Sequence, residues 1–159
     1  AIIILITFLL GKNLQDNFQN YYFILQLHNS FGLLIFTLAI FRIIWIYLNI
    51  KPDATSNKII FMKVASVTHI IFYILFFIIP ITGYLLTNLQ GDAASFFGTS
   101  LPNILDKNSE LKYYIHNTHY YLGNILLLIL SLHVLGAFYH HLILKDNTLR
   151  RISFMNLKK

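Results

Sequence analysis

Three long apolar stretches dominate the hydrophobic pattern of the chain. They run from Leu25 to Ile46, from Val64 to Leu86 and from His119 to Leu144. Each is longer than the roughly 20 residues that an α-helix needs to cross the hydrocarbon core of a bilayer. Each stretch therefore predicts a transmembrane helix.

The opening run AIIILITFLL, residues 1–10, is equally apolar but only half as long. No basic residue precedes it and no small-residue cleavage site follows it, so it lacks the form of a signal peptide. We expect it to be the end of a first transmembrane helix that starts upstream of Ala1. The predicted fold class is an all-α membrane protein, a four-transmembrane-helix bundle in a single domain over residues 1–159, with its first helix truncated in this sequence.

Composition supports a lipid-facing chain. Hydrophobic residues make up 57% of the sequence and charged residues only 11%, whereas about a quarter of a typical soluble domain is charged. The sequence contains no cysteine, which excludes disulfides, iron–sulfur clusters and thiolate metal sites. The net charge of +6 is explained by orientation in the membrane, without nucleic acid as a partner.

The positive charges gather on one side of the predicted bundle. The loop after the second helix and the C-terminal tail carry Lys51, Lys58, Lys63, Lys145, Arg150, Arg151, Lys158 and Lys159. The two opposite loops carry Lys12, Lys107 and Lys112 against Asp16, Asp92, Asp106 and Glu110. The positive-inside rule places both termini in the cytoplasm. The connection from Thr87 to Thr118 is long and is expected to fold over the outer surface.

Histidines are the polar residues that stand out within the apolar stretches. His28, His69, His119, His133 and His140 lie in them or at their edges, and His116 and His141 lie beside them. Ionisable residues at membrane depth are costly and commonly mark a functional site. A histidine near a helix end can instead extend to the interface, but His133 has more than two helical turns on either side.

The spacing of two histidines points to two cofactors. His119 and His133 are 14 residues apart, which returns them to within roughly 40° of one helix face and separates them by about 21 Å. That distance is too large for one ion, but it suits two haem groups stacked across the bilayer, each with an axial imidazole.

Small residues separate candidate ligands from the other histidines. A macrocycle beside a ligand is crowded most by the residue four positions on, which lies on the same helix face. After His28, His119 and His133 these neighbours are Gly32, Gly123 and Ala137, whereas after His69 the neighbour is Tyr73. Small residues also serve close helix packing, which alone could explain one or two of the three.

Depth pairs the candidates. His28 and His119 lie in the outer halves of their helices and can hold an outer haem together. His133 lies deeper and needs a partner at its own level. That partner is either His69, the only other helix candidate here, or a residue upstream of Ala1.

An ordered set of motifs resembles the bacterial cytochrome b561 family, in particular its superoxide oxidase members. The set comprises LHNSFGLLIFTLAIFRIIW at 27–45, HIIFYILFFIIPITGY at 69–84, GDAASFFGTSLP at 91–102, His119, His133, and HH at 140–141 followed by KDNTLRR. The resemblance covers almost the whole chain.

The resemblance implies a bacterial inner-membrane cytochrome with two haem b groups. His28 and His119 would hold the outer haem, and His133 would share the inner haem with a histidine upstream of Ala1. In such relatives superoxide is oxidised to oxygen on the outer side and ubiquinone is reduced. Arg42, His69, His140 and His141 are candidate contacts for haem propionates or the quinone.

Two alternatives remain open at this point. The first is a di-haem electron-transfer subunit for a dehydrogenase or hydrogenase partner. The second is a haem-free proton or metal transporter that uses intramembrane histidines as a relay. A relay would call for carboxylates among the histidines, and the three long apolar stretches contain none.

Overall fold

Four helices account for most of the chain in the computed structural model, which describes residues 1–14, 19–49 and 59–145. They are α1 (Ile2–Asn13), α2 (Tyr21–Leu48), α3 (Ile59–Gln90) and α4 (Ser109–Leu142), with two short strands, β1 (Ser95–Phe96) and β2 (Thr99–Ser100). Among the described residues, α2, α3 and α4 are long and apolar enough to cross a membrane, and α1 is a shorter apolar helix. The chain is therefore a helical membrane protein, as predicted.

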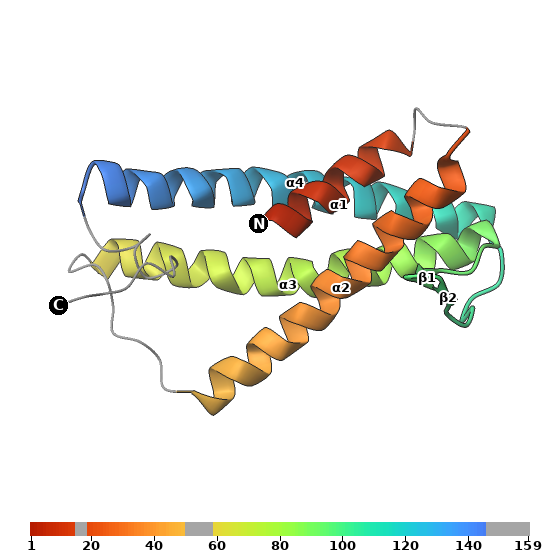
Figure 1. Ribbon diagram of the computed structural model, residues 1–159, viewed down its shortest axis with the longest axis horizontal. Coiled ribbons are helices and arrows are strands. Elements are labelled where there is room, and N and C mark those ends of the chain that lie inside the picture. The colour runs from red at the N-terminus through yellow and green to blue at the C-terminus, as the bar shows by residue number, and fades with distance from the viewer. Residues whose placement is uncertain (15–18, 50–58, 146–159) are drawn as a thin grey trace.

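One of the three long helices, α2, diverges from the other two. Figure 1 shows α3 and α4 running side by side, while α2 crosses them obliquely and separates from them toward its C-terminal end. α1 packs against α2 and touches α4, in the half of the bundle that also carries β1 and β2. We call this half, which contains the C-terminal end of α1, the N-terminal end of α2 and the α3–α4 connection, the hairpin half.

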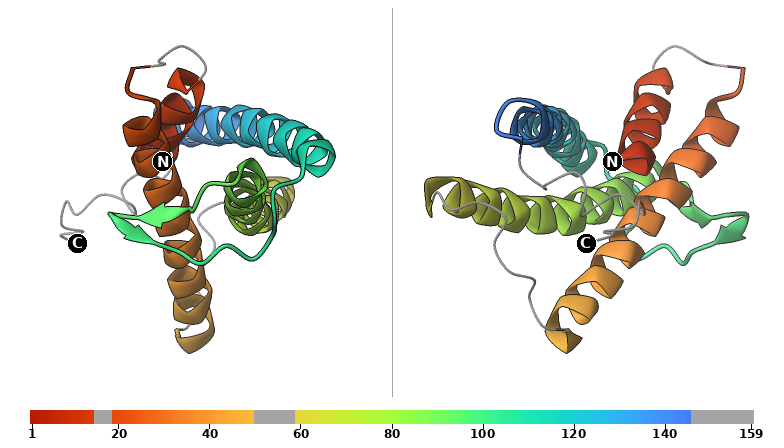
Figure 2. Two further views of the ribbon diagram at one scale, coloured as in Figure 1. Left: turned by 90° about the vertical axis from the view of Figure 1, so that its right-hand side faces the viewer. Right: turned by 60° about the vertical axis from the view of Figure 1, so that its left-hand side comes forward.

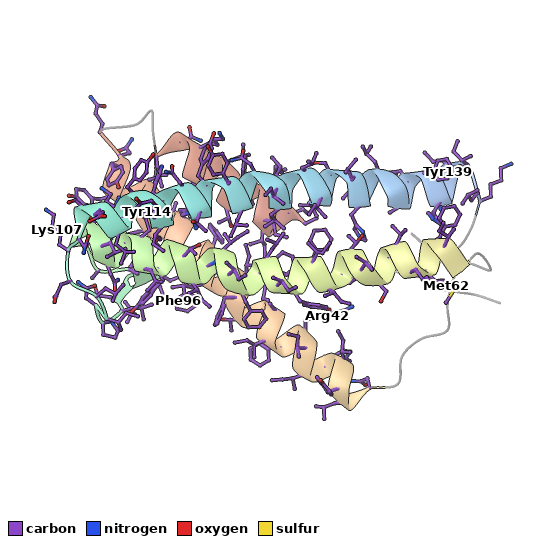
Figure 3. All side chains as sticks on the ribbon, turned by 180° about the vertical axis from the view of Figure 1, so that it is seen from behind. Arg42, Met62, Phe96, Lys107, Tyr114 and Tyr139 are labelled. Atoms are coloured by element: carbon purple, nitrogen blue, oxygen red, sulfur yellow. The ribbon has the colours of Figure 1, made fainter. Side chains whose placement is uncertain are left out.

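Most apolar side chains face outward. Trp45 is 63% exposed and Leu128 is 60% exposed. Large hydrophobic side chains are exposed along all three long helices. The buried core is small and is built on Phe72, Leu75 and Leu126, with Ile4 of α1 packed against it. Such a surface suits lipid, since hydrocarbon chains solvate it as well as a protein core would. Figure 3 shows these side chains along both sides of the helices.

The helix that carries His119 begins ten residues before the predicted apolar span, at Ser109 instead of His119. Its start is set by capping: the side chain of Asn108 accepts a hydrogen bond from the Leu111 N–H at 2.9 Å, and Glu110 lies in the positive first turn. Hydrophobic patterning does not detect these polar turns. Since α3 also continues to Gln90, the connection is shorter than the predicted range of Thr87 to Thr118.

The α3–α4 connection folds back against the outside of the bundle. β1 and β2 pair antiparallel around a two-residue turn in which Phe97 and Gly98 both have positive φ, +46° and +91°. The buried Ser30 hydroxyl of α2 accepts the Phe97 N–H at 2.9 Å, which fixes the turn beside α2. Figure 2 shows the hairpin projecting sideways past α2.

Candidate functional site

A cavity of about 290 Å³ lies between the four helices in the hairpin half. Two of its lining residues are the predicted ligands His28 and His119. Each helix also contributes one glycine to the wall, namely Gly11, Gly32, Gly83 and Gly123. The two predicted ligands therefore share one cavity.

The two imidazoles face each other across this cavity. The ring centroids of His28 and His119 lie 6.0 Å apart, with the ring planes at 77°. A metal–imidazole bond is about 2 Å long, so two imidazoles on opposite sides of one metal have ring centroids about 6 Å apart. The spacing therefore fits two axial ligands of a single metal.

Backbone carbonyls hold both rings through Nδ1. His28 Nδ1 lies 2.8 Å from the Thr7 carbonyl oxygen of α1, and His119 Nδ1 lies 3.1 Å from the Ile79 carbonyl oxygen of α3. A carbonyl can only accept, so each Nδ1 carries the proton and donates it. The lone pair of each neutral ring is then on Nε2, the arrangement that a metal-binding histidine with a backbone second partner adopts.

A glycine makes each of these contacts possible. A Cβ atom at Gly11 would stand 2.8 Å from His28 Cε1, and one at Gly83 would stand 3.0 Å from His119 Cε1. Each glycine lies four residues after the accepting carbonyl and so shares its helix face. α1 and α3 therefore each present a carbonyl and a glycine as one seat for an imidazole of the neighbouring helix.

The other two glycines keep space open beside the rings. A Cβ atom at Gly32 or at Gly123 would meet nothing within 4 Å. They follow His28 and His119 by four residues, which is where a bound macrocycle needs room. The sequence-based interpretation of these two glycines agrees with this open space.

The polar rim of the cavity contains Lys12. Its Nζ lies 3.4 Å from the Tyr120 hydroxyl and 4.9 Å from the centroid of the Tyr120 ring. Gln90 and His116 also line the cavity near this rim. The rim thus combines a cation with hydrogen-bonding groups, which suits an anion or a carboxylate.

A second pair of histidines lies toward the other end of α3 and α4. The ring centroids of His69 and His133 are 5.4 Å apart, and the Phe72 ring is also 5.4 Å from that of His133. His140 packs on Phe61 with a centroid separation of 5.0 Å. The structure brings the predicted residues together in two groups, one in each half of the bundle.

The remaining candidates lie apart from these pairs. Arg42 is exposed on α2, where that helix has separated from the others (Figure 3). His141 follows His140 at the end of α4, and its Nδ1 is buried without a hydrogen-bond partner in the described part of the chain. The tail motif after Lys145 lies outside the described residues.

Comparison with known proteins gives the family. The family described as prokaryotic cytochrome b561 matches residues 1–154. The chain belongs to this family. It is also similar to cytochrome b561 homolog 1 of Escherichia coli strain K12, with 32% identity over 84% of this chain and 77% of that protein.

Two further relatives bear on the activity. The probable superoxide oxidase CybB of Yersinia pestis is 32% identical over 80% of this chain and 73% of that protein. Cytochrome b561 homolog 2 of Escherichia coli strain K12 is 28% identical over 80% of this chain and 69% of that protein. This member of the cytochrome b561 family is thus a membrane electron-transfer protein, and family membership implies haem b.

The cavity in the hairpin half fits a haem on the chemistry of its donors. It offers two Nε2 lone pairs, a mainly apolar lining and open space beside Gly32 and Gly123. Sequence reasoning identified His28, His119, Gly32 and Gly123, but it missed the seats on α1 and α3. Gly11 and Gly83 carry no signal that links them to a histidine on another helix.

Proposed function

We propose that this chain is a di-haem b cytochrome that oxidises superoxide on the outer side of the inner membrane and passes the electrons to ubiquinone. His28 and His119 would be the axial ligands of the outer haem, and His133 a ligand of the inner haem. The observation that carries the proposal is the opposed His28–His119 pair, with both Nδ1 atoms on backbone carbonyls.

Haem b supplies a one-electron couple when it is bound. His28 and His119 would hold this haem between them, and an oxygen species would then exchange electrons at the edge of the site. Two superoxide anions each lose one electron and become oxygen. Ubiquinone takes up those two electrons and two protons and becomes ubiquinol, so electrons and protons balance.

Lys12 supports an anionic donor at the rim. It is the cation nearest to the Tyr120 edge of the cavity, and a positive charge at the mouth of a site raises the local concentration of small anions. The CybB relative, named as a probable superoxide oxidase, points to the same donor. His69, Arg42, His140 and His141 are assigned to the surroundings of the inner haem and the quinone.

The test is superoxide-driven ubiquinone reduction by the purified full-length protein, with superoxide dismutase as the control that removes the donor. We expect two haems per chain and ubiquinol formation that dismutase abolishes. Lys12→Gln should lower the rate roughly two- to fivefold at low ionic strength, and the difference should shrink in high salt. Lys63→Gln, a lysine at the opposite end of the molecule, is the matched control.

The outcomes separate the candidate functions. Two haems without superoxide-driven quinone reduction would favour the electron-transfer subunit for a dehydrogenase or hydrogenase. A colourless protein would contradict the proposal and the electron-transfer-subunit alternative.

A further inference from the structure

The seat of His119 has a component that the seat of His28 lacks. The Thr82 hydroxyl oxygen lies 3.1 Å from His119 Nδ1 and 2.8 Å from the Ile79 carbonyl oxygen. The Thr82 side chain is buried, with 7% of its surface exposed. His119 Nδ1 therefore has two acceptors in reach, whereas the contact of His28 Nδ1 in the described structure is to the Thr7 carbonyl.

The directions of these hydrogen bonds follow from chemistry. The Ile79 carbonyl oxygen cannot donate, so the protons that approach it come from the Thr82 hydroxyl and from His119 Nδ1. The Nδ1–H can be accepted by the Ile79 carbonyl oxygen and by the Thr82 hydroxyl oxygen, which are both 3.1 Å away. When the Thr82 proton is directed to Ile79, the lone pairs of the hydroxyl oxygen remain for the Nδ1–H. In this arrangement the Ile79 carbonyl, the Thr82 hydroxyl and His119 Nδ1 contact one another, and His119 Nδ1 acts only as a donor.

The seat of His28 on α1 has no hydroxyl at the position that corresponds to Thr82. Thr82 lies three residues after the carbonyl that holds His119, and the residue three after Thr7 is Leu10, which has no polar side-chain atom. The two seats share a carbonyl and a glycine and differ at this position. The carbonyl and the glycine alone hold the His28 ring, so the Thr82 hydroxyl is not required to hold an imidazole in such a seat.

We propose that Thr82 is a positioning residue for the outer haem, which fixes His119 with its proton on Nδ1 and lowers the midpoint potential of that haem. A hydrogen-bond acceptor at Nδ1–H, the ring N–H that does not face the metal, makes the imidazole a stronger electron donor to the metal. This favours the ferric state. The inference rests on the proposed function, because it requires His119 to be an axial ligand.

The experiment is a redox titration of the purified full-length protein and of five variants. Thr82→Val removes the hydroxyl at nearly unchanged volume, and Thr82→Ser keeps it. Thr118→Val is the matched control, because Thr118 adjoins His119 in sequence but is exposed, and its hydroxyl donates to Tyr114 of its own helix. His119→Ala and His133→Ala identify which potential belongs to which haem.

We expect Thr82→Val to raise the potential of the haem that His119→Ala removes and to leave the other potential unchanged. The low-spin electron paramagnetic resonance signal of the same haem should shift, since it reports the donor strength of the axial imidazole. Thr82→Ser should restore both readings, and Thr118→Val should resemble the unmodified protein. Loss of only the outer haem in Thr82→Val, with Thr82→Ser intact, would also support the positioning role.

Two results would overturn the inference, and they differ from failure of the proposed function. If Thr82→Val retains both haems with an unchanged or lower outer potential, Thr82 has no such role even though His119 is a ligand. If Thr82→Ser shifts the potential as much as Thr82→Val, the effect comes from packing and not from the hydroxyl. If His119→Ala removes no haem, the proposed function fails first.

Discussion

Gly83 lies directly against the imidazole of His119, so that a Cβ atom on it would stand 3.0 Å from Cε1. Movement of the ring away from Gly83 is restrained, because His119 Nδ1 lies 3.1 Å from the Ile79 carbonyl oxygen on the same face of α3. The glycine and the carbonyl together define one position for the ring.

Gly83→Ala should therefore displace His119 and weaken the outer haem site. The added methyl has to move the ring or separate α3 from α4, at a cost of about 1–3 kcal/mol typical of overpacking. We expect reduced haem content with a remaining inner-haem spectrum, measured by pyridine haemochrome assay. Gly98→Ala is unsuitable as a control because of its positive φ.

Gly11→Ala should have a larger effect than Gly83→Ala. Here the added Cβ would stand only 2.8 Å from His28 Cε1, closer than real contacts allow, and the ring is held by the shorter 2.8 Å bond to Thr7. The measurement is the same haem assay, with the two variants compared directly. Equal, full haem content in both variants would contradict the seat that we describe.

Gly123→Leu should separate folding of the chain from haem binding. A Cβ atom at Gly123 would meet nothing within 4 Å, and Gly123 lines the same cavity as His119, so the added side chain would compete with the macrocycle for that space. We expect helical content by circular dichroism close to that of the unmodified protein, together with loss of the outer haem. Full occupancy of both haems in this variant would show that the macrocycle lies elsewhere.

Single histidine variants test the assignment of ligands. His28→Ala and His119→Ala should each remove the outer haem and leave the inner one, whereas His133→Ala should do the reverse. The measurement is haem per protein together with the reduced absorption spectrum. Identical spectra in His28→Ala and His133→Ala would contradict two separate sites.

Ser30→Ala should destabilise the attachment of the hairpin to α2. Ser30 is 1% exposed, and its hydroxyl is the acceptor for the Phe97 N–H at 2.9 Å. Removing it takes the partner from the part-buried Phe97 N–H, at a cost of about 0.5–1.5 kcal/mol. The expected result is a lower thermal unfolding temperature. Ser131→Ala is the matched control, because that exposed hydroxyl donates only within its own helix to Leu127, and it should change stability by much less.

The sequence by itself determined the membrane character and the three long helices. Runs of more than 20 apolar residues leave no other solution, because backbone polar groups in lipid must be paired within a helix or a closed barrel. It also determined which histidines share a helix face and which of them are followed, four residues on, by a small residue. Both depend on the fixed rise and rotation of an α-helix, so spacing along the chain is enough.

Other parts of the fold did not follow from hydrophobic pattern. The polar first turns of α4 are helical because Asn108 caps them, a local effect that apolar periodicity does not register. The hairpin depends on a turn with two positive φ values and on Ser30, which lies 67 residues before Phe97 in the chain.

Only the tertiary structure decided how each imidazole is held. Gly11 and Gly83, like the Thr7 and Ile79 carbonyls, belong to helices other than those of the histidines that they contact. The pairing of a ring with a carbonyl and a glycine depends on how two helices cross, which is set by packing across the whole bundle. No regularity along one helix encodes it, so sequence spacing singled out the candidate histidines while the packed bundle alone determined their orientation and proton position.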